Sequence, residues 1–356
     1  MAWAQALRGD KVHFVAGNYS ECHRYTTFNP YASTHFFDAQ TPDPNKLSLL
    51  QLQNAVALLD PYVDLFHVHN EPNYLFRAVK EMTDKPIIFD IHDWTSVRES
   101  KDTPQVELDH EKFAIENADG ICVVSKGYLE KIRKITNKPT LWIKSMVPRQ
   151  FFSKGPRNTN PGLVYEGGTK GRNNLLYNYP YRNWASFAQE AVKKFENGSK
   201  IYFYTANDGE DFTEYQHEKI NVYPPQNYHA LISFLRTHSV GLVGSPFPIP
   251  DFADSLPNKL FEYTAAGIPC IVINAPEAEK YAVDNGLGIG VRDASEVYDA
   301  LATLTDHPIE KDRWGYTMES ELPKLDAFYE EVIECSRNQN SICQIENLEK
   351  VIQSVE

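Results

Sequence analysis

The sequence has no long apolar run and no secretory leader, and these two absences argue against a membrane-spanning or exported protein. No stretch approaches the roughly 18 uninterrupted apolar residues that a membrane-spanning helix needs. The first residues also lack the succession of charged, apolar and small residues that forms a signal peptide. We therefore expect the protein to be cytoplasmic.

Closely paired cysteines are missing as well. The five cysteines are scattered, and none forms a Cys-x-x-Cys pair. Two of them, Cys122 and Cys270, fall within strands that we expect to be buried, where a reduced cysteine has a structural role. The cysteines therefore predict neither a zinc site nor a disulfide framework.

Positive charge is scarce, since the formal net charge is −13. A surface of this sign repels the phosphate backbone, which argues against general nucleic-acid binding. Residues 126–144 are the exception, with six basic residues and one acidic residue, Glu130. Two interpretations remain open: a solvated helix face, or a patch that meets an anionic lipid or a phosphate-bearing acceptor at the inner face of a membrane.

The 356 residues are enough for two domains that each bury a core. Predicted strands and helices alternate along most of the chain, which is typical of α/β domains with parallel sheets. The alternation breaks at residues 153–161, which are rich in Gly, Pro, Asn and Lys. We therefore expect an N-terminal domain at residues 1–150, a C-terminal domain at residues 151–325 and terminal helices at residues 326–356.

Residues 256–274 predict a loop, a short helix, a tight turn and a buried strand. Leu260, Phe261 and Ala265 form one apolar stripe, and Gly267 ends the helix. The first N–H groups of such a helix favour a phosphate in the preceding loop, and Glu262 could accept both hydroxyls of a ribose. The alternative is an ordinary α/β crossover in which the Glu262 side chain is solvated.

The segment Asn258-Lys-Leu-Phe-Glu-Tyr, followed by Ala-Ala-Gly-Ile-Pro, resembles the nucleotide-sugar signature of the retaining GT-B glycosyltransferases. That signature is a Glu, seven residues and a second Glu. Glu262 takes the second position, which holds the donor ribose in the family. Asp254 takes the first position, which contacts the transferred sugar, with a shorter carboxylate. The resemblance also implies donor contacts at Leu256, Asn258 and Lys259.

The resemblance covers nearly the whole chain and implies an α/β fold of two Rossmann-like domains with parallel sheets that face each other across a cleft. The terminal helices would pack back onto the N-terminal domain. The start of the chain departs from this pattern, because a predicted helix at residues 2–7 precedes the first predicted strand at residues 11–16. We therefore expect the opening strand and Gly-rich loop of the family to be missing.

The C-terminal domain opens with a predicted strand and the sequence Glu-Gly-Gly-Thr-Lys-Gly-Arg, residues 166–172. Gly167 and Gly168 let the backbone approach a diphosphate closely, and Lys170 and Arg172 supply positive charge. A glycine turn with basic neighbours is common by itself, but its position matches the family's donor-diphosphate loop. The resemblance implies that all four residues bind the donor and that Lys170 and Arg172 neutralise the departing nucleoside diphosphate.

Two predicted strands of the N-terminal domain, residues 63–69 and 85–93, end in polar residues, namely His69, Glu71, His92 and Asp93. Ligands of open parallel sheets lie beyond the carboxyl ends of the strands. The resemblance implies that His92 positions the acceptor or the sugar, and the alternative is a hydrogen-bonded histidine in a core turn. Asn70 separates His69 from Glu71, whereas the relatives have Glu-Pro directly after this histidine.

Two loops, residues 18–33 and 94–106, are expected to recognise the acceptor. The first is rich in polar and aromatic residues, as binding loops are, although an unliganded surface loop has the same composition.

The sequence thus predicts a glycosyltransferase that moves a sugar from a UDP- or GDP-sugar to a glycan, lipid-linked or small-molecule acceptor with retention of configuration. No cofactor and no metal ion are expected, since basic residues supply the positive charge; an ion held by His69, His92 and Asp93 is the minor alternative. Two other hypotheses remain, a nucleotide-sugar epimerase and a non-catalytic sugar-nucleotide-binding subunit. The tail is either a further helix or an oligomer contact.

Overall fold

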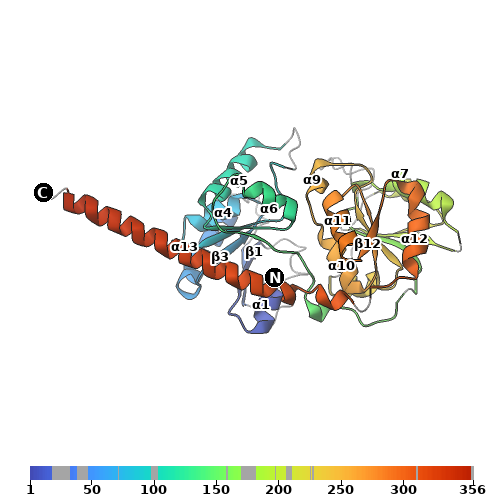
Figure 1. Cartoon of the computed structure of the whole chain (residues 1–356), viewed down its shortest axis with the longest axis horizontal. Helices are drawn as coiled ribbons and strands as arrows, with labels where there is room; N and C mark the ends of the chain where they lie inside the picture. The colour runs from blue at the N-terminus through green and yellow to red at the C-terminus, as the bar shows by residue number, and fades with distance from the viewer. Residues whose placement is uncertain are drawn as a thin grey trace. The chain divides into compact units, whose positions relative to one another are not determined.

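The computed structural model describes residues 1–17, 33–37, 47–70, 72–97, 103–157, 159–169, 182–196, 198–205, 211–224, 226, 228–309 and 312–353. The chain forms two compact units (Figure 1). Ala2–Ile143 and Glu321–Glu356 make the N-terminal unit, and Lys144–Ser320 make the C-terminal unit. The predicted features outside the described residues are most of the 18–33 loop, part of the 94–106 loop, Glu71, Lys170 and Arg172.

The C-terminal unit is built on a six-stranded parallel sheet. Its strands are β7 (Gly162–Gly167), β8 (Lys200–Thr205), β9 (Ile220–Tyr223), β10 (Val240–Gly244), β11 (Cys270–Ile273) and β12 (Gly288–Val291), in the spatial order β12-β11-β10-β7-β8-β9. Counted along the chain, this is the 3-2-1-4-5-6 order of a Rossmann sheet. The alternation of strands and helices that the sequence predicts is confirmed in this unit.

Helices connect these strands: α7 (Ala185–Ala191), α8 (Tyr228–Leu235), α9 (Pro250–Ala253), α10 (Asn258–Ala266), α11 (Pro276–Asp284) and α12 (Val297–Thr305). All side chains of β10 and β11 are buried. A parallel sheet covered by helices on both faces requires such continuous apolar strands. Trp184, Phe203 and Tyr215 contribute large buried side chains to the core of this unit.

The N-terminal unit contains two parallel sheets. β1 (His13–Gly17) pairs with β2 (Ser33–Phe37), and β3 (Phe66–His69), β4 (Ile87–Ile91), β5 (Gly120–Val123) and β6 (Thr140–Trp142) form the second sheet in that order. Its helices are α1 (Ala2–Arg8), α3 (Leu47–Leu59), α4 (Tyr74–Lys80), α5 (Gln105–Asn117) and α6 (Lys126–Ile132). The predicted helix before the first strand is confirmed, and β6 is an additional strand.

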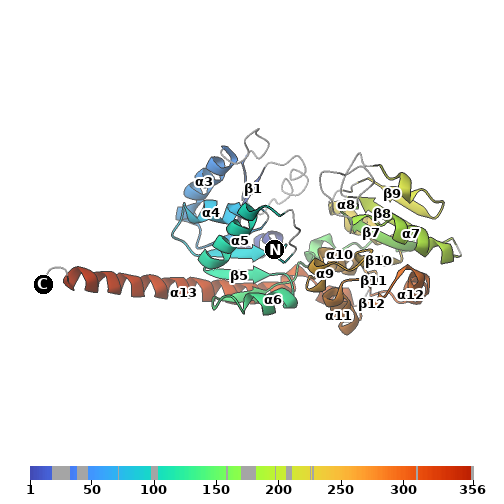
Figure 2. The ribbon, with the colours of Figure 1, turned by 90° about the horizontal axis from the view of Figure 1, so that it is seen from above.

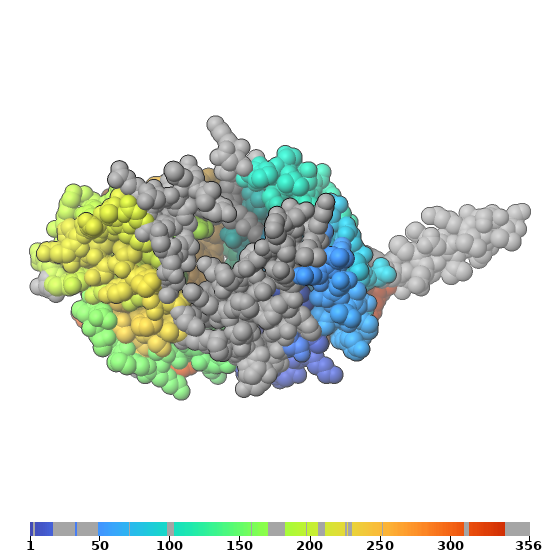
Figure 3. Space-filling model, turned by 180° about the vertical axis from the view of Figure 1, so that it is seen from behind, coloured from blue at the N-terminus to red at the C-terminus, as the bar shows by residue number. Residues whose placement is uncertain are grey.

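The surface of α3 is blue in Figure 3, which shows the molecule from behind. Two leucines of this helix, Leu50 and Leu58, are exposed, whereas Leu52 and Val56 are buried against the unit's core. The helix therefore buries one apolar face, as the helical spacing of its sequence predicts.

The chain ends in a single long helix, α13 (Met318–Gln353), where the sequence predicted several helices (Figure 2). Gly120 of β5 leaves space for this helix, because a Cβ at this position would lie 2.4 Å from Cγ2 of Val332. Arg8 and Asp326 add an ion pair with an N–O distance of 2.5 Å. No helix of the described residues combines the length and apolar character that crossing a bilayer requires.

His238, which lies between α8 and β10, attaches the segment before β7 to the C-terminal sheet. Its Nδ1 donates to the carbonyl oxygen of Asn160 at 3.0 Å, and its Nε2 lies 3.2 Å from the hydroxyl of Tyr204. The side chain is fully buried. Burial lowers the pKa of His238 to about 4, against the opposing effect of the Asn160 hydrogen bond.

We expect acid to destabilise the C-terminal unit through His238. The imidazole has a pKa near 6.5 in an unfolded chain and about 4 in the folded protein. Between these two pH values the unfolded state is protonated at this histidine and the folded state is not, so acid favours unfolding. The contribution of neutral His238 to the free energy of unfolding is complete above pH 6.5 and declines by about 3 kcal/mol as the pH falls toward 4. Hydrogen exchange of β10 amides, measured against pH, should show this loss.

Replacement His238→Gln should remove that part of the pH dependence while keeping an N–H donor for Asn160. The exposed His307→Gln provides the control, with the wild-type dependence retained. An acid response of β10 that is the same in His238→Gln and wild type would contradict this account.

Candidate functional site

The centre of the C-terminal sheet is the point where the strand order reverses. β7 and β10 are neighbours there, and the connections from them run in opposite directions. Open α/β sheets bind their ligands beyond the carboxyl ends of the strands at such a switch point. Gly167 ends β7 and Gly244 ends β10. The donor residues that the sequence predicts therefore lie at the ends of these two strands or in the segments that come after them.

Gly167 adopts a backbone angle φ of 125°, which residues with a side chain rarely take. A Cβ at this position would lie 3.4 Å from Nζ of Lys259, and one at Gly168 would lie 2.8 Å from Nη1 of Arg182. The structure thus brings Gly167 together with Lys259, two of the predicted donor-binding residues. Arg182 was missed, because the sequence shows no link between this arginine and a glycine fourteen residues earlier.

Lys259 lies in the first turn of α10, with its Nζ 5.2 Å from the centre of the Tyr165 ring. Burial by itself would lower the pKa of Lys259, but Tyr165, Glu166 and Glu262 outweigh burial and raise it. The ammonium group is therefore held charged at neutral pH.

Glu262 follows Lys259 by three residues, so both side chains lie on the same side of α10. Only 9% of the Glu262 residue surface is exposed. A buried carboxylate can accept hydrogen bonds from hydroxyl groups, and the half-buried ammonium of Lys259 can attract a phosphate.

Tyr263 fixes α10 to the sheet. Its ring covers Gly241, where a Cβ would lie only 2.2 Å from Cδ2 of the ring. Its hydroxyl accepts from the amide of Glu166 and donates to the carbonyl of Leu242, both at 3.2 Å. The helix is thereby attached to β7 and β10 together.

The two ends of α10 differ in how they are capped. Pro257 precedes the helix as its N-cap, and its side chain offers no acceptor to the first N–H groups. Gly267, with φ of 78°, ends the helix in the left-handed conformation, as the sequence predicts. Arg313 donates to the Ala265 carbonyl at 2.8 Å, and Arg236 donates to the Ala266 carbonyl at 2.9 Å. The positive end of the helix dipole lies at Pro257 and Asn258, where a negatively charged group would be stabilised.

The remaining predicted donor residues precede α10. Asp254 caps the C-terminal end of α9, Leu256 is buried, and Asn258 is the exposed first residue of α10. Their roles stay predictions, as do those of Lys170 and Arg172, which lie outside the described residues.

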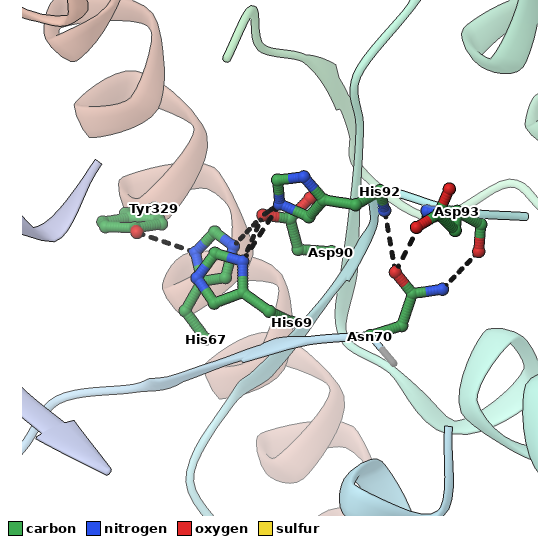
Figure 4. Close-up of polar contacts among 7 residues, drawn as sticks. All are labelled: His67, His69, Asn70, Asp90, His92, Asp93 and Tyr329. Carbon is green, nitrogen blue, oxygen red and sulfur yellow. Dashed lines mark hydrogen bonds and ion pairs between the residues drawn. The ribbon is translucent and has the colours of Figure 1, made fainter. Parts of the chain in front are cut away.

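The N-terminal unit contains a second polar cluster at the ends of β3 and β4 (Figure 4). Oδ2 of the fully buried Asp90 lies 3.1 Å from Nε2 of His67, 2.9 Å from Nδ1 of His69 and 3.1 Å from Nε2 of His92. The sequence analysis found His69 and His92, and it placed Asp93 beside them only in the minor alternative of a bound ion. The carboxylate that contacts the histidines is Asp90. Asp90 is two residues before His92 and shares its side of the chain, whereas Asp93 is the next residue and points to the other side.

Asp90 and two of the histidines, His69 and His92, influence each other's pKa. Burial would raise the pKa of Asp90, but His92 and His69 hold it well below its usual value. Burial would lower the pKa of His92, and Asp90 reverses this effect and raises it. Desolvation lowers the pKa of His69, against the opposing attraction of Asp90.

Asn70 holds the loop that follows β4. Its Oδ1 accepts from the amides of His92 at 2.8 Å and Asp93 at 3.3 Å, and its Nδ2 donates to the Asp93 carbonyl. The residue that interrupts the family's pattern after His69 is therefore the residue that positions the His92 backbone.

Comparison with known proteins was made by sequence and by structure. No protein-family model matches the chain, and no curated protein matches it in sequence. Sucrose-phosphate synthase from Thermosynechococcus elongatus superposes with a TM-score of 0.62 at 14% identity, over 100% of this chain and 92% of that one. HepE from Anabaena, solved with UDP, gives 0.56 at 11% identity, over 94% and 100% of the two chains. These neighbours are GT-B glycosyltransferases.

The chain has the GT-B fold. UGT73P12 from Glycyrrhiza uralensis, solved with a glycyrrhetinic acid monoglucuronide, gives a TM-score of 0.55 at 12% identity, over 98% of this chain and 95% of that one. The predicted fold class, two α/β units with parallel sheets, is confirmed.

We expect Asn70→Ala to loosen the loop after β4 in this GT-B protein. The substitution leaves the amides of His92 and Asp93 without their acceptor and should lower the free energy of unfolding by about 1–3 kcal/mol. Hydrogen exchange of these two amides is the local measurement. Asn70→Asp keeps the acceptor and loses the donor, so it should retain most of the amide protection; equal protection in Asn70→Ala and wild type would contradict the assignment.

Proposed function

We propose that the protein is a glycosyltransferase that takes its sugar from a nucleotide-sugar donor. The observation that carries this proposal is the placement of Lys259 and Glu262 on α10, next to Gly167, at the switch point of a sheet with GT-B architecture. A helix N-terminus, a charged amine and a buried carboxylate within one turn match the phosphate and the ribose of a nucleoside diphosphate.

In this proposal the donor diphosphate lies at the N-terminus of α10, near Gly167, Gly168 and Lys259. The ribose hydroxyls donate to Glu262. UDP is the first candidate, because HepE from Anabaena, one of the structural neighbours, was solved with UDP. A GDP-sugar is the alternative, since none of the named groups reads the base.

The transfer itself is proposed to retain the anomeric configuration. Lys259, Lys170, Arg172 and the α10 dipole neutralise the charge that develops on the departing diphosphate, the interaction that often makes the largest contribution to catalysis. Asp254 contacts the transferred sugar, and His92 positions the acceptor. The acceptor is a glycan, a lipid-linked sugar or a small molecule. Analysis of the products formed from a nucleotide sugar would distinguish transfer from hydrolysis or epimerisation of the donor.

Glu262→Ala should weaken nucleotide-sugar binding with the fold intact, because the ribose loses its charged acceptor. Loss of one charge-assisted hydrogen bond costs about 1.5–3 kcal/mol, or roughly ten- to a hundredfold in Kd. Calorimetric titration with UDP-sugars and GDP-sugars measures this change. Glu279→Ala, an exposed glutamate on α11, is the matched control, and an unaltered Kd in Glu262→Ala would remove Glu262 from the site.

We also expect transfer to continue after chelation. Protein cations and a helix N-terminus already provide the charge that a divalent ion would bring to the diphosphate. Turnover is to be measured with metal-stripped protein in excess EDTA, beside a sample supplied with Mg²⁺. Activity that appears only on return of a divalent ion would refute a metal-independent transfer.

A further inference from the structure

The cluster in the N-terminal unit arises from the register of two strands. β3 and β4 are parallel neighbours in which His69 lies opposite Asp90. Side chains two residues apart on a strand share a face, so His67 and His69 on β3 lie on the same face as Asp90 of β4. His92 follows directly after the end of β4, and its Nε2 also lies next to Asp90. Four side chains with ligand atoms therefore converge from two adjacent strands (Figure 4).

The distances within the cluster suit a tetrahedral metal site. Zinc binds nitrogen and oxygen at about 2.0–2.1 Å, and the edge of a tetrahedron with such bonds is about 3.3 Å. The three nitrogens lie 2.9–3.1 Å from Oδ2 of Asp90, and His69 Nδ1 lies 3.2 Å from His92 Nε2. The ligand atoms of His67, His69 and Asp90 are all within 4.8 Å of one another.

The contacts of the Asp90 carboxylate also indicate a metal site. A carboxylate can accept about four hydrogen bonds, two on each oxygen. Here all three imidazoles meet Oδ2, while the buried Oδ1 has no hydrogen-bond partner among the described residues. A hydrogen-bonded network would distribute its donors over both oxygens, whereas a shared ion requires the ligand atoms to gather at one point.

Tyr329 supplies the support that a metal-binding histidine needs. Its hydroxyl lies 2.8 Å from Nδ1 of His67, on the opposite side of the ring from Asp90. A hydrogen bond to the second ring nitrogen fixes the tautomer that leaves Nε2 unprotonated for a metal. This tyrosine belongs to α13, so the terminal helix contributes directly to the cluster.

We infer that His67, His69 and Asp90, with His92 as the fourth ligand, form a binding site for a divalent transition-metal ion, of which Zn²⁺ fits best. Three imidazole nitrogens and one carboxylate oxygen are ligands that zinc prefers in tetrahedral geometry. Calcium and magnesium fit poorly, because both select oxygen ligands and higher coordination numbers.

The test is metal binding by the full chain after removal of metals. Co²⁺ in place of zinc reports tetrahedral coordination by its visible absorption, and elemental analysis after dialysis against Zn²⁺ gives the stoichiometry. We expect one ion per chain. His69→Ala, whose side chain is partly exposed, and Asp90→Asn should each weaken binding about tenfold or more, while His110→Ala, in the same unit and outside the cluster, should bind as wild type.

Two results would overturn the metal site: substoichiometric uptake by wild type, or wild-type affinity in His69→Ala. The cluster would then be a hydrogen-bonded charge cluster. A further readout rests on the proposed function, because an ion that occupies His92 should slow sugar transfer. Stoichiometric binding with unchanged transfer would leave the metal site standing and would remove His92 from the transfer reaction.

Discussion

The proposed donor site depends on the attachment of one side chain, Tyr263, to the middle of the C-terminal sheet. Its hydroxyl joins the Glu166 amide on β7 to the Leu242 carbonyl on β10, and its ring fills the space above Gly241. Lys259 and Glu262 are carried by the same helix, so their distance from the end of β7 follows from this attachment. A buried aromatic ring with both hydroxyl bonds satisfied gives a rigid support to the polar groups that it carries.

The charges at the other end of α10 complete this arrangement. Arg236 and Arg313 are both buried, and each donates to one of the last carbonyls of the helix. Buried guanidinium groups are costly without acceptors, and the helix C-terminus supplies acceptors with partial negative charge. The arginines thus stabilise the fold at the end of the helix that is remote from the proposed phosphate.

Local patterns in the sequence predicted most of the C-terminal unit, because its central strands are continuous apolar runs and α10 ends at Gly267. The link between Gly167 and Lys259 agreed with the expected site, although the roles of both residues stay predictions. The sequence predicted only part of the polar cluster in the N-terminal unit, namely His69 and His92. Asp90 stands inside an apolar strand, and its proximity to His67 and His69 depends on the pairing of β3 with β4, which no local pattern encodes. The strand β6 was not predicted, because its three residues are too few to show a strand pattern.

The close fit between Gly241 and Tyr263 has an evolutionary consequence. A methyl group at position 241 would occupy the volume of the tyrosine ring, so a change there is tolerated only together with a smaller residue at position 263. Such a pair of changes would give up the hydroxyl that joins β7 to β10. Positions 241 and 263 are therefore bound to covary among homologues, although they are remote in the chain and neither needs to touch a substrate.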